Sequence, residues 1–543
     1  MNSLSYLGSF TPHKGAAWFS RSPYTRITMA SGEDKDPSSS LKLTWKAFAG
    51  LGAVSAVYFA DLSLKASQKC FWFDELFTVY LCRLPSLKNT WTAVAHGADF
   101  NPPLFYLLTR GAQRLFGEGL IATRLPAMVG VWLFSVCLFF FVARRAGIIS
   151  GFIAGAFPFF TLAQYYAYEA RAHGVVLGWC GLALVCWQRN AEGRARNLWL
   201  AGFGLSLMGA LLTHVYAVYL VAPFVVVELY NLLSKRLVNW GILGVMALAF
   251  ASVTLSVYLP LFRMYRVAVP PTFFPASHDL LQHFLVNVIG PATIVLLLPL
   301  LLASINGTLP AQRANTSVVV PRQEVVVAAG FACIPLVGLI GCKVSNGPFL
   351  DRYFLSSIAG YAILLGFASS RRQVDSWAAK ALAGCMFFLM IADLGTTLYL
   401  RVVHRIMLVE PSTGLALSTN PSNPMQKCES VSIDQSGLDI MVLPSLEYLY
   451  LFRYAPPSVI SHLYYGAPAN DINLWGYEKL AKWARIDLKT TTVSQFLVTH
   501  NRFLIYESGN SVHVDEVQAI VNAGYRLISA RADVVGIMYE YAK

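Results

Sequence analysis

Two adjacent carboxylates, Asp74 and Glu75, stand in the stretch FWFDELFTVYL at residues 71–81, whose nine other residues are apolar, aromatic or threonine. An ionised acid in such surroundings costs free energy unless it is paired or put to use. A carboxylate can deprotonate an incoming hydroxyl, and hydrophobic surroundings raise its pKa toward the range that this task needs. We therefore regard Asp74 and Glu75 as candidate catalytic groups. An alternative is that Asp74 caps a helix that Glu75 begins.

Several further polar groups from distant parts of the chain are predicted to reach the same level as Asp74. They are Asp99 and Asn101, Glu169, Arg171 and His173 in YEARAHG, His214 and Tyr216 in THVY, and Asp351, Arg352 and Tyr353 in DRYF. An acid, guanidinium groups and imidazoles that converge in this way fit group transfer from a membrane-bound phosphate, because arginine binds phosphate oxygens with two donors. We expect Asp74 to face the arginines across a gap sized for a sugar phosphate.

Each of these residues also has a structural interpretation. Asn101 can cap a helix that starts at Pro102–Pro103. Arg171 and Arg352 can extend toward water or pair with the neighbouring acids Glu169 and Asp351. The two histidines can be hydrogen-bonded fillers at the membrane boundary. The coincidence of the whole set favours a functional site more than any single member does.

Composition places these residues in a membrane protein. Of 543 residues, 56% are hydrophobic and only 13% are charged. Long uncharged runs match the roughly 20 residues that a helix needs to span a bilayer, so a polytopic helical protein is predicted. We expect eleven spans at about 43–63, 125–143, 147–165, 172–188, 197–213, 215–233, 237–262, 284–304, 325–342, 353–370 and 380–400. The fifth and sixth come from one uncharged run that must turn near THVY.

The distribution of Lys and Arg predicts the orientation of the chain. Basic connections and poorly basic connections alternate along the eleven spans, and the basic side is cytoplasmic. The N-terminus is then cytoplasmic and the C-terminus lies outside. The net charge of +13 follows mostly from this asymmetry and from basic ends. It does not indicate nucleic-acid binding, because no basic stretch is interleaved with exposed aromatics on a soluble module.

Three parts flank or interrupt the spans. Residues 1–42 are predicted to be a disordered cytoplasmic tail, and residues 64–124 form a first external loop. In that loop NPPLFYLLTRGAQRLFG (101–117) predicts a helix in the interface plane, with one apolar and one basic face. Nine cysteines are scattered without a CxxC pair, and a pairing of Cys70 with Cys82 in this loop remains open.

The last part, residues 401–543, has the composition of a small α/β domain outside the membrane. Strands are predicted at 438–444, 496–500, 502–507 and 534–542, and helices at 445–455, 474–484 and 514–525. No GxGxxG or P-loop is present, so we assign this domain no cofactor.

The motifs together resemble a known superfamily. FDELFT, DFNPPLFYLLTRGAQRLFG running into ATRLPAMVGV, YYAYEARAHG, THVYAVYL and DRYFLSSIAGYAILLG resemble, in this order over residues 43–400, the GT-C glycosyltransferases. The branch is that of the bacterial dolichyl-phosphate-mannose protein mannosyltransferase-like enzymes, which includes the lipid A aminoarabinose transferases.

This resemblance implies a function. Such enzymes take a sugar from a polyprenyl phosphate and pass it, with inversion, to a hydroxyl of a lipid, glycan or protein on the outer face of a bacterial inner membrane. By position in the motifs, Asp74 is the expected base and Glu75 its partner. Arg171, His173 and Arg352 are expected at the donor phosphate. The remaining polar groups are expected to contact substrate, namely Asp99, Asn101, His214, Tyr216, Asp351 and Tyr353.

The chain also departs from the family pattern. Ala172–His173 stand where the family often has Pro-Tyr, and Phe100–Asn101 stand where the aminoarabinose transferases have a Glu-Lys pair before the two prolines. No cofactor is therefore certain, and a divalent metal and an aminoarabinose donor are both left open. A secondary transporter is an alternative, although transporters carry polar groups at mid-membrane within an inverted repeat, and no repeat is visible here. An inactive relative that binds lipid or scaffolds the envelope is another.

Overall fold

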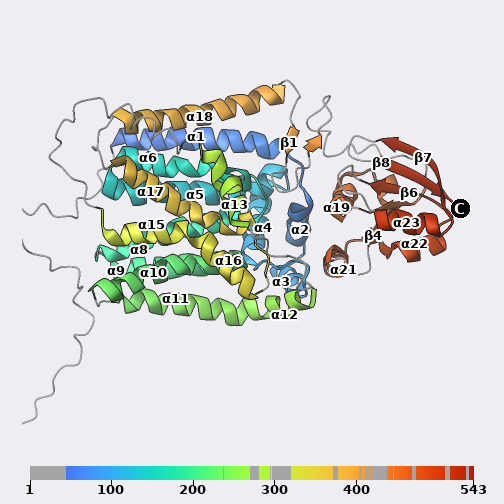
Figure 1. Cartoon of the computed structure of the whole chain (residues 1–543), viewed down its shortest axis with the longest axis horizontal. Helices are drawn as coiled ribbons and strands as arrows, with labels where there is room; N and C mark the ends of the chain where they lie inside the picture. The colour runs from blue at the N-terminus through green and yellow to red at the C-terminus, as the bar shows by residue number, and fades with distance from the viewer. Residues whose placement is uncertain are drawn as a thin grey trace, which may run out of the picture.

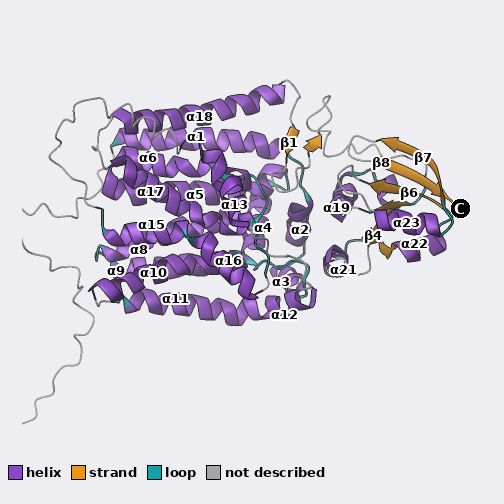
Figure 2. Cartoon of the chain, viewed as in Figure 1, coloured by secondary structure: helices purple, strands orange, loops and turns teal. Residues whose placement is uncertain are grey.

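The computed structural model describes residues 44–235, 238–268, 280–293, 295, 320–345, 347–370, 377–402, 407–409, 416–418, 437–443, 445–467, 472–507, 514–532 and 537–543. A bundle of long helices lies side by side, and a smaller domain of strands and helices sits at one end of it (Figures 1 and 2). Three short helices lie at this same end, between the bundle and the small domain. The predicted tail, residues 1–42, lies outside the described residues.

The bundle consists of helices with apolar interiors and several 3₁₀ and π turns. They are α1 (Trp45–Gln68), α5 (Leu120–Ala146), α6 (Ile148–Ala156), η2 (Phe157–Phe160), α7 (Leu162–Ala167), α8 (Ala172–Ala191), α9 (Arg196–Thr213), η3 (Val215–Leu220), α10 (Val221–Lys235), α11 (Trp240–Val253), η4 (Thr254–Tyr258), α12 (Leu259–Ala268), α13 (Leu280–Phe284), η5 (Leu285–Ile289), η6 (Gly290–Ala292), α15 (Arg322–Ala332), α16 (Ile334–Ser345), η7 (Asp351–Ser357), α17 (Ile358–Ser370) and α18 (Trp377–Val402).

Every predicted span overlaps described helix, although the span at 284–304 continues beyond the described residues. Among the described residues, six helices are long and apolar enough to cross a membrane, and a seventh span results if α15 and α16, bent by 47°, count as one. The predicted break in THVY is confirmed: α9 ends at Thr213 and His214 is extended (φ −154°, ψ 138°). A polytopic helical bundle is thus supported, and the count of eleven stays a prediction.

Close contact between α5 and α8 fixes the segment that carries Arg171. A Cβ atom on Gly130 would lie 2.2 Å from the carbonyl oxygen of Gly174, and one on Gly178 would lie 2.9 Å from that of Gly130. Glycine is required at these crossings because any side chain would push the two backbones apart. The N-terminal end of α8 is therefore held directly against α5.

A partly exposed ionic contact joins the first and last helices of the bundle. Lys65 Nζ lies 2.8 Å from Asp61 Oδ2 and 2.7 Å from Asp393 Oδ2, and Gln164 Nε2 donates to the same oxygen of Asp393 (2.7 Å). One ammonium group between two carboxylates satisfies charges that would otherwise be costly in apolar surroundings. This contact holds α18 against α1.

The loop that was predicted to be external, residues 64–124, contains α2 (Phe73–Cys82), α3 (Leu87–Ala95) and α4 (Leu104–Phe116). The predicted interfacial helix is α4, but its faces differ from the prediction. Leu107, Leu108 and Leu115 are exposed, whereas Tyr106 and Arg110 are buried, so the polar side packs inward. An exposed apolar face on a helix at the bundle's end suits contact with lipid at the interface.

Two possibilities that the sequence left open in this loop are not observed. The N-cap of α4 is Pro103, with no side-chain cap, and Asn101 donates instead to Asp99 (3.1 Å). Cys82 is a free thiol, whereas Cys70 is disulfide-bonded, so these two cysteines do not pair with each other.

The small domain contains a mixed sheet between two layers of helices. Its strands and helices are β3 (Ile440–Val442), α19 (Ser445–Tyr454), α20 (Pro457–Ile460), β4 (Leu463–Ala467), α21 (Ile472–Ala484), β5 (Thr490–Thr492), α22 (Val493–Thr499), β6 (Arg502–Glu507), α23 (Val514–Asn522), β7 (Arg526–Ala532) and β8 (Ile537–Ala542). The strand order is β5-β4-β3-β6-β8-β7, parallel from β5 to β6 and antiparallel thereafter. A separate pair, β1 (Met407–Val409) and β2 (Ala416–Ser418), is antiparallel.

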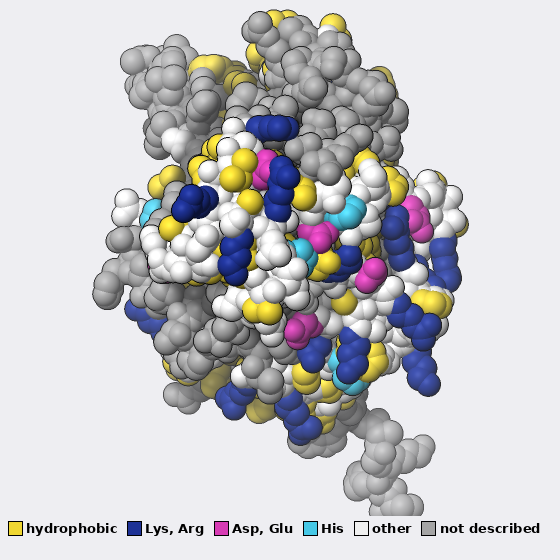
Figure 3. Space-filling view, turned by 90° about the vertical axis from the view of Figure 1, so that its right-hand side faces the viewer, with side chains coloured by type: hydrophobic (Ala, Val, Ile, Leu, Met, Phe, Trp, Pro, Cys, Tyr) yellow, Lys and Arg dark blue, Asp and Glu magenta, His cyan; other side chains and the backbone are white. Residues whose placement is uncertain are grey.

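Alternate residues of β3 face opposite layers of this domain. Ile440 and Val442 join a cluster that includes Tyr477, whereas Met441 joins a second cluster with Phe496. Successive side chains of a strand point to opposite faces of the sheet, so both faces of β3 are covered by apolar side chains. On the described surface turned away from the bundle, basic side chains are scattered among acidic, imidazole and uncharged ones (Figure 3).

The small α/β domain is confirmed, with one predicted strand wrong. Residues 496–500 belong to α22, because Thr492 and Gln495 form a capping box that starts a helix: the Thr492 hydroxyl accepts from the Gln495 backbone amide. The segment is also too short and too apolar for its period to distinguish strand from helix. The strands β4, β5 and β7 were not predicted.

The small domain packs directly on α2. Tyr477 is fully buried, and its ring stacks on Phe77 (centroids 6.1 Å apart, planes 9° apart) and meets Phe73 edge-on at 6.1 Å. The hydroxyl of Tyr454 accepts a hydrogen bond from the backbone amide of Phe71 (2.9 Å). Aromatic pairs of this kind contribute about 0.5–1.5 kcal/mol each beyond area burial. The helix that carries Asp74 is thus fixed from the side of the small domain.

Tyr477→Ala should loosen this contact, since deleting a buried aromatic side chain costs about 3–5 kcal/mol. We expect limited proteolysis to release the small domain faster than from the unchanged protein. Tyr477→Phe keeps the ring and serves as the matched control. Equal cleavage rates for Tyr477→Ala and Tyr477→Phe would contradict the role of the ring.

Candidate active site

Asp74 and Glu75 lie in the first turn of α2, which begins at Phe73 after the N-cap Trp72. Negative charge is favoured there by the helix dipole. The two side chains point in different directions, since neighbouring helical residues are about 100° apart. The Asp74 side chain is 18% exposed, whereas that of Glu75 is fully buried. Asp74 is not the cap of this helix.

Glu75 forms a two-pronged ion pair with Arg124 of α5. Arg124 Nε donates to Glu75 Oε1 (2.7 Å) and Arg124 Nη2 donates to Oε2 (2.6 Å). The carboxylate also accepts from the backbone amides of Ala170 (2.6 Å) and Trp72 (3.3 Å). Burial would raise the pKa of Glu75, but Arg124 outweighs it and the net pKa lies below its ordinary value. Glu75 is therefore an ionised group whose oxygens are already occupied.

Arg124 also satisfies the end of α1. Its guanidinium donates to three carbonyl oxygens, those of Ala66 (2.7 Å), Lys69 (2.6 Å) and Cys70 (3.1 Å). The last carbonyls of a helix have no partner within the helix, so a planar group with five donors suits this position. Arg124 ties α1, α2 and the 170 segment to α5.

Asp74 contacts both predicted arginines directly. Its Oδ2 lies 3.4 Å from Arg171 Nη2 and 3.5 Å from Arg352 Nη2. Arg171 Nη1 also donates to the backbone carbonyl of Asp74 (3.0 Å). The three side chains are between 11% and 18% exposed. They meet as the sequence predicts, but the expected gap is absent from these contacts: carboxylate and guanidinium groups touch.

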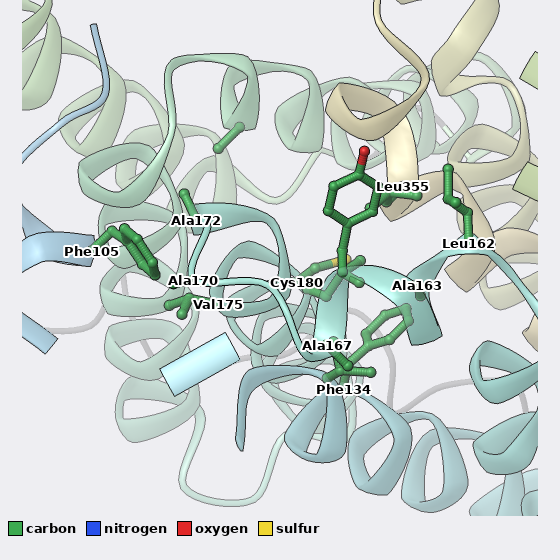
Figure 4. Close-up of a cluster of buried hydrophobic side chains, with 14 of the residues drawn as sticks. Phe105, Phe134, Leu162, Ala163, Ala167, Ala170, Ala172, Val175, Cys180 and Leu355 are labelled. Atoms are coloured by element: carbon green, nitrogen blue, oxygen red, sulfur yellow. The ribbon is translucent and has the colours of Figure 1, made fainter. Parts of the chain in front are cut away.

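Arg171 is held by its neighbours in the chain. Ala170 and Ala172, on either side of it, are buried in an apolar cluster with Phe105 (Figure 4). Arg171 Nη1 lies 3.7 Å from Asp99 Oδ2. Burial would lower the pKa of Arg171, but the carboxylates of Asp74 and Asp99 raise it above its ordinary value. Arg171 is therefore a fixed positive charge.

Asp99 is the centre of a second set of contacts. It accepts from the hydroxyl of Tyr106 (2.6 Å), the backbone amide of Phe100 (2.6 Å) and the side chain of Asn101. Burial and the negative charge of Asp99 raise the pKa of Tyr106. Asp99 and Asn101 thus lie beside Arg171, and Asp99 orients it.

His173, His214, Tyr216 and Tyr353 form a ring cluster next to Arg352. The ring centroids of the two histidines are 5.0 Å apart, and Tyr353 lies 5.0 Å from His214 and 4.2 Å from Tyr216. These four predicted residues lie together. Asp351 instead accepts from Asn287 (2.7 Å), with no ion pair to Arg352 among the described contacts.

The alternative pairing of Arg171 with Glu169 is also wrong. Glu169 is fully buried and pairs with Lys69, and it accepts from the indole of Trp72. Arg124 and Lys69 are the charged groups at the site that sequence reasoning missed. The signal for Arg124 was its position beside an apolar run, where an unpaired charge is costly.

Among the described residues, no group of three or more His, Cys, Asp or Glu side chains is arranged to hold a metal ion.

The fold is shared with two crystal structures of ArnT from Cupriavidus metallidurans. The apo structure has a TM-score of 0.53 at 14% identity, over 91% of this chain and 97% of that chain. The structure bound to undecaprenyl phosphate has a TM-score of 0.51 at 14% identity, over 92% and 98%. No protein-family model matches the sequence, and no curated protein matches it. The chain therefore shares the fold of ArnT, as the predicted resemblance implies.

Arg124→Lys should destabilise the protein although the charge is kept, because an ammonium group cannot donate to Glu75 and to three carbonyls at once. Breaking a buried ion pair costs about 3–5 kcal/mol. We expect a lower thermal unfolding midpoint in detergent. Arg114→Lys, on the exposed side of α4, is the matched control and should leave the midpoint unchanged. Equal midpoints for both variants would contradict the structural role of Arg124.

Proposed function

We propose that this protein is a membrane glycosyltransferase. It transfers a sugar from a polyprenyl-phosphate donor to a hydroxyl acceptor outside the membrane, with inversion at the sugar carbon. The observation that supports this most is the contact of Asp74 with Arg171 and Arg352 at the end of the bundle that faces the small domain. The fold shared with ArnT supports it further, since one ArnT structure is bound to undecaprenyl phosphate.

In this proposal the two arginines bind the donor phosphate. The acceptor oxygen attacks the sugar carbon, the bond from that carbon to the phosphate oxygen breaks, and the acceptor proton passes to Asp74. The leaving group changes from a phosphodiester to a phosphate monoester, so negative charge grows on it. Fixed cations in a site with little water stabilise such charge by several kcal/mol.

Binding of the phosphate would also change the state of Asp74. Without donor, Asp74 is the anionic partner of Arg171 and Arg352. The phosphodiester of the donor also offers two oxygens that share a negative charge, so it can replace the carboxylate as the partner of the guanidinium donors. Once the phosphate takes these donors, Asp74 is released to accept a proton. The same cluster then serves binding and base catalysis in turn.

The other residues support these two roles. Glu75 positions α2 through Arg124, and Asp99 orients Arg171. His173, His214, Tyr216 and Tyr353 lie beside Arg352, where they can contact the donor. Asn101 and Asp351 lie in hydrogen bonds near the cluster and are proposed substrate contacts. The acceptor is a lipid, a glycan or a protein.

Asp74→Asn removes the proton acceptor and keeps the size of the side chain. We expect the rate of sugar transfer to fall roughly 10²–10⁴-fold, the usual contribution of a general base. The measurement is release of polyprenyl phosphate from a radiolabelled polyprenyl-phosphate sugar by the purified protein. Donor binding should persist. Near-normal turnover would show that Asp74 is not the base.

Arg352→Ala is the contrasting variant in the same assay. It removes one guanidinium from the cluster, so donor affinity should fall more than acceptor affinity. An equal loss of donor and acceptor affinity would show that Arg352 has only a structural role, as an ion-pair partner. Accumulation of intact donor in vesicles, without release of polyprenyl phosphate, would support a transporter instead.

We also propose the bacterial inner membrane as the location, with the N-terminus cytoplasmic and the small domain periplasmic. Lys and Arg asymmetry between the connections supports this orientation. A reporter that is active only in the periplasm should work when fused after residue 420 and fail when fused after residue 372. The reverse pattern would place the ion cluster on the wrong side for an external reaction.

A further inference from the structure

A cavity of about 270 Å³ lies between α1, α18 and the short helices η2, α7 and η6, away from the Asp74 cluster. Its walls are mostly apolar, and the aromatic side chains of Tyr58 and Phe159 are part of them. Three polar side chains, Asp61, Gln164 and Asp393, line the same space. The volume lies near the lower end of the range of about 300–1,000 Å³ for small-molecule sites, so it suits a small headgroup and not a whole lipid.

The cavity reaches the outer surface of the bundle beside side chains that suit contact with lipid. Helix α18 lies at the edge of the bundle next to α1 (Figure 1). Two lining residues, Pro291 and Asp393, are exposed or partly exposed at this surface. Phe388 and Ile391 of α18 are exposed apolar neighbours of Asp393. A ligand that enters from this side therefore comes from the membrane.

Asp61 and Asp393 lie at the level where lipid headgroups begin. Each stands sixteen residues after the first residue of its helix, Trp45 in α1 and Trp377 in α18, which is about 24 Å at 1.5 Å per residue. The hydrocarbon core of a bilayer is about 30 Å thick. Because both helices end on the side of the small domain, the two carboxylates lie near that boundary, within reach of the headgroups of that leaflet.

The polar corner of the cavity carries an excess of one negative charge. Lys65 contacts both carboxylates, but one ammonium group neutralises only one of them. The nearby cations Arg124 and Lys69 are matched by Glu75 and Glu169, so they do not balance the second carboxylate. An unbalanced charge in apolar surroundings is costly, and a further cation is therefore favoured here.

An ammonium group suits this corner better than a phosphate does. Both hydrogen bonds that the Asp393 side chain accepts from described residues use Oδ2, so Oδ1 can accept from a ligand. The rings of Tyr58 and Phe159 lie 4.8 Å apart at the wall, and aromatic ring faces attract an ammonium group. The phosphate of a polyprenyl-phosphate lipid would instead be repelled by the excess negative charge.

We propose that this cavity binds the headgroup of a phospholipid of the ethanolamine type, with the lipid ammonium at Asp393 and the acyl chains along α18. The site is separate from the Asp74 cluster, and the inference does not depend on the proposed glycosyltransferase function. A proton on one carboxylate would also balance the charge, but it would give no preference for one lipid headgroup over another. Binding measurements therefore distinguish these two explanations.

Two phospholipids with the same acyl chains test the proposal on the purified full-length protein, after removal of copurified lipid. Phosphatidylethanolamine carries the ammonium group, whereas N-acetyl-phosphatidylethanolamine lacks it. We expect native mass spectrometry to show at least tenfold tighter binding of the first lipid, which equals about 1.4 kcal/mol. An excess of undecaprenyl phosphate should not displace it. Equal binding of the two phospholipids, or displacement by undecaprenyl phosphate, overturns the proposal.

Variants locate this preference in the cavity. Asp393→Asn removes one carboxylate and should bring the ratio of the two affinities toward unity. Glu118→Gln is the matched control, because it removes an exposed carboxylate outside the cavity and should keep the ratio. Leu389→Trp fills the cavity without a change of charge, and it should also abolish the preference if Asp393→Asn does not fold. A preference that survives in both Asp393→Asn and Leu389→Trp would place the lipid elsewhere and overturn the proposal.

Discussion

The fully buried ion pair between Glu75 and Arg124 is the constraint on which the site depends. It joins the end of α1, the start of α2 and the segment before Arg171 to a single side chain of α5. Each of these segments lies at the end of a helix, where backbone groups lack a partner within the helix, and the pair supplies partners for several of them. Glu75 belongs to the pair and accepts a hydrogen bond from the backbone amide of Ala170. Asp74 precedes Glu75 and Arg171 follows Ala170, so this hydrogen bond brings Asp74 close to Arg171.

Much of the site could be predicted from the sequence, but the sequence did not show which of the two adjacent carboxylates is buried. Asp74, Arg171 and Arg352 were identified because each has a charge that apolar surroundings make costly, and because the motifs place them on one side of the membrane. The different surroundings of Asp74 and Glu75 could not be predicted. Adjacent residues of a helix face different surroundings, and only the position of Arg124, 49 residues away, decides which carboxylate is buried and occupied.

The bundle was predictable for a simple reason, whereas the contacts of the small domain were not. Apolar runs determine helices in a membrane almost alone, because the backbone has no other way to satisfy its hydrogen bonds there. Short apolar segments fit a strand as well as a helix, so residues 496–500 were assigned to a strand although Thr492 and Gln495 start a helix. The ring of Tyr477 stacks on that of Phe77, which lies 400 positions away in the chain. A contact over this distance cannot be predicted from a local sequence pattern.

The direct contact of Asp74 with two arginines has a consequence for how the cluster works. Two guanidinium groups face the carboxylates of Asp74 and Asp99, so the cluster is balanced in charge before any anion arrives. A buried cation without a partner would be costly, so the carboxylate of Asp74 stabilises the two arginines in the absence of an anion. In the proposed mechanism this carboxylate gives up its guanidinium partners when the donor phosphate binds, and it then accepts the proton of the acceptor hydroxyl. Under that proposal one negative charge balances the arginines in the empty site and acts as the base when donor is bound, which accounts for the direct contact of Asp74 with both arginines.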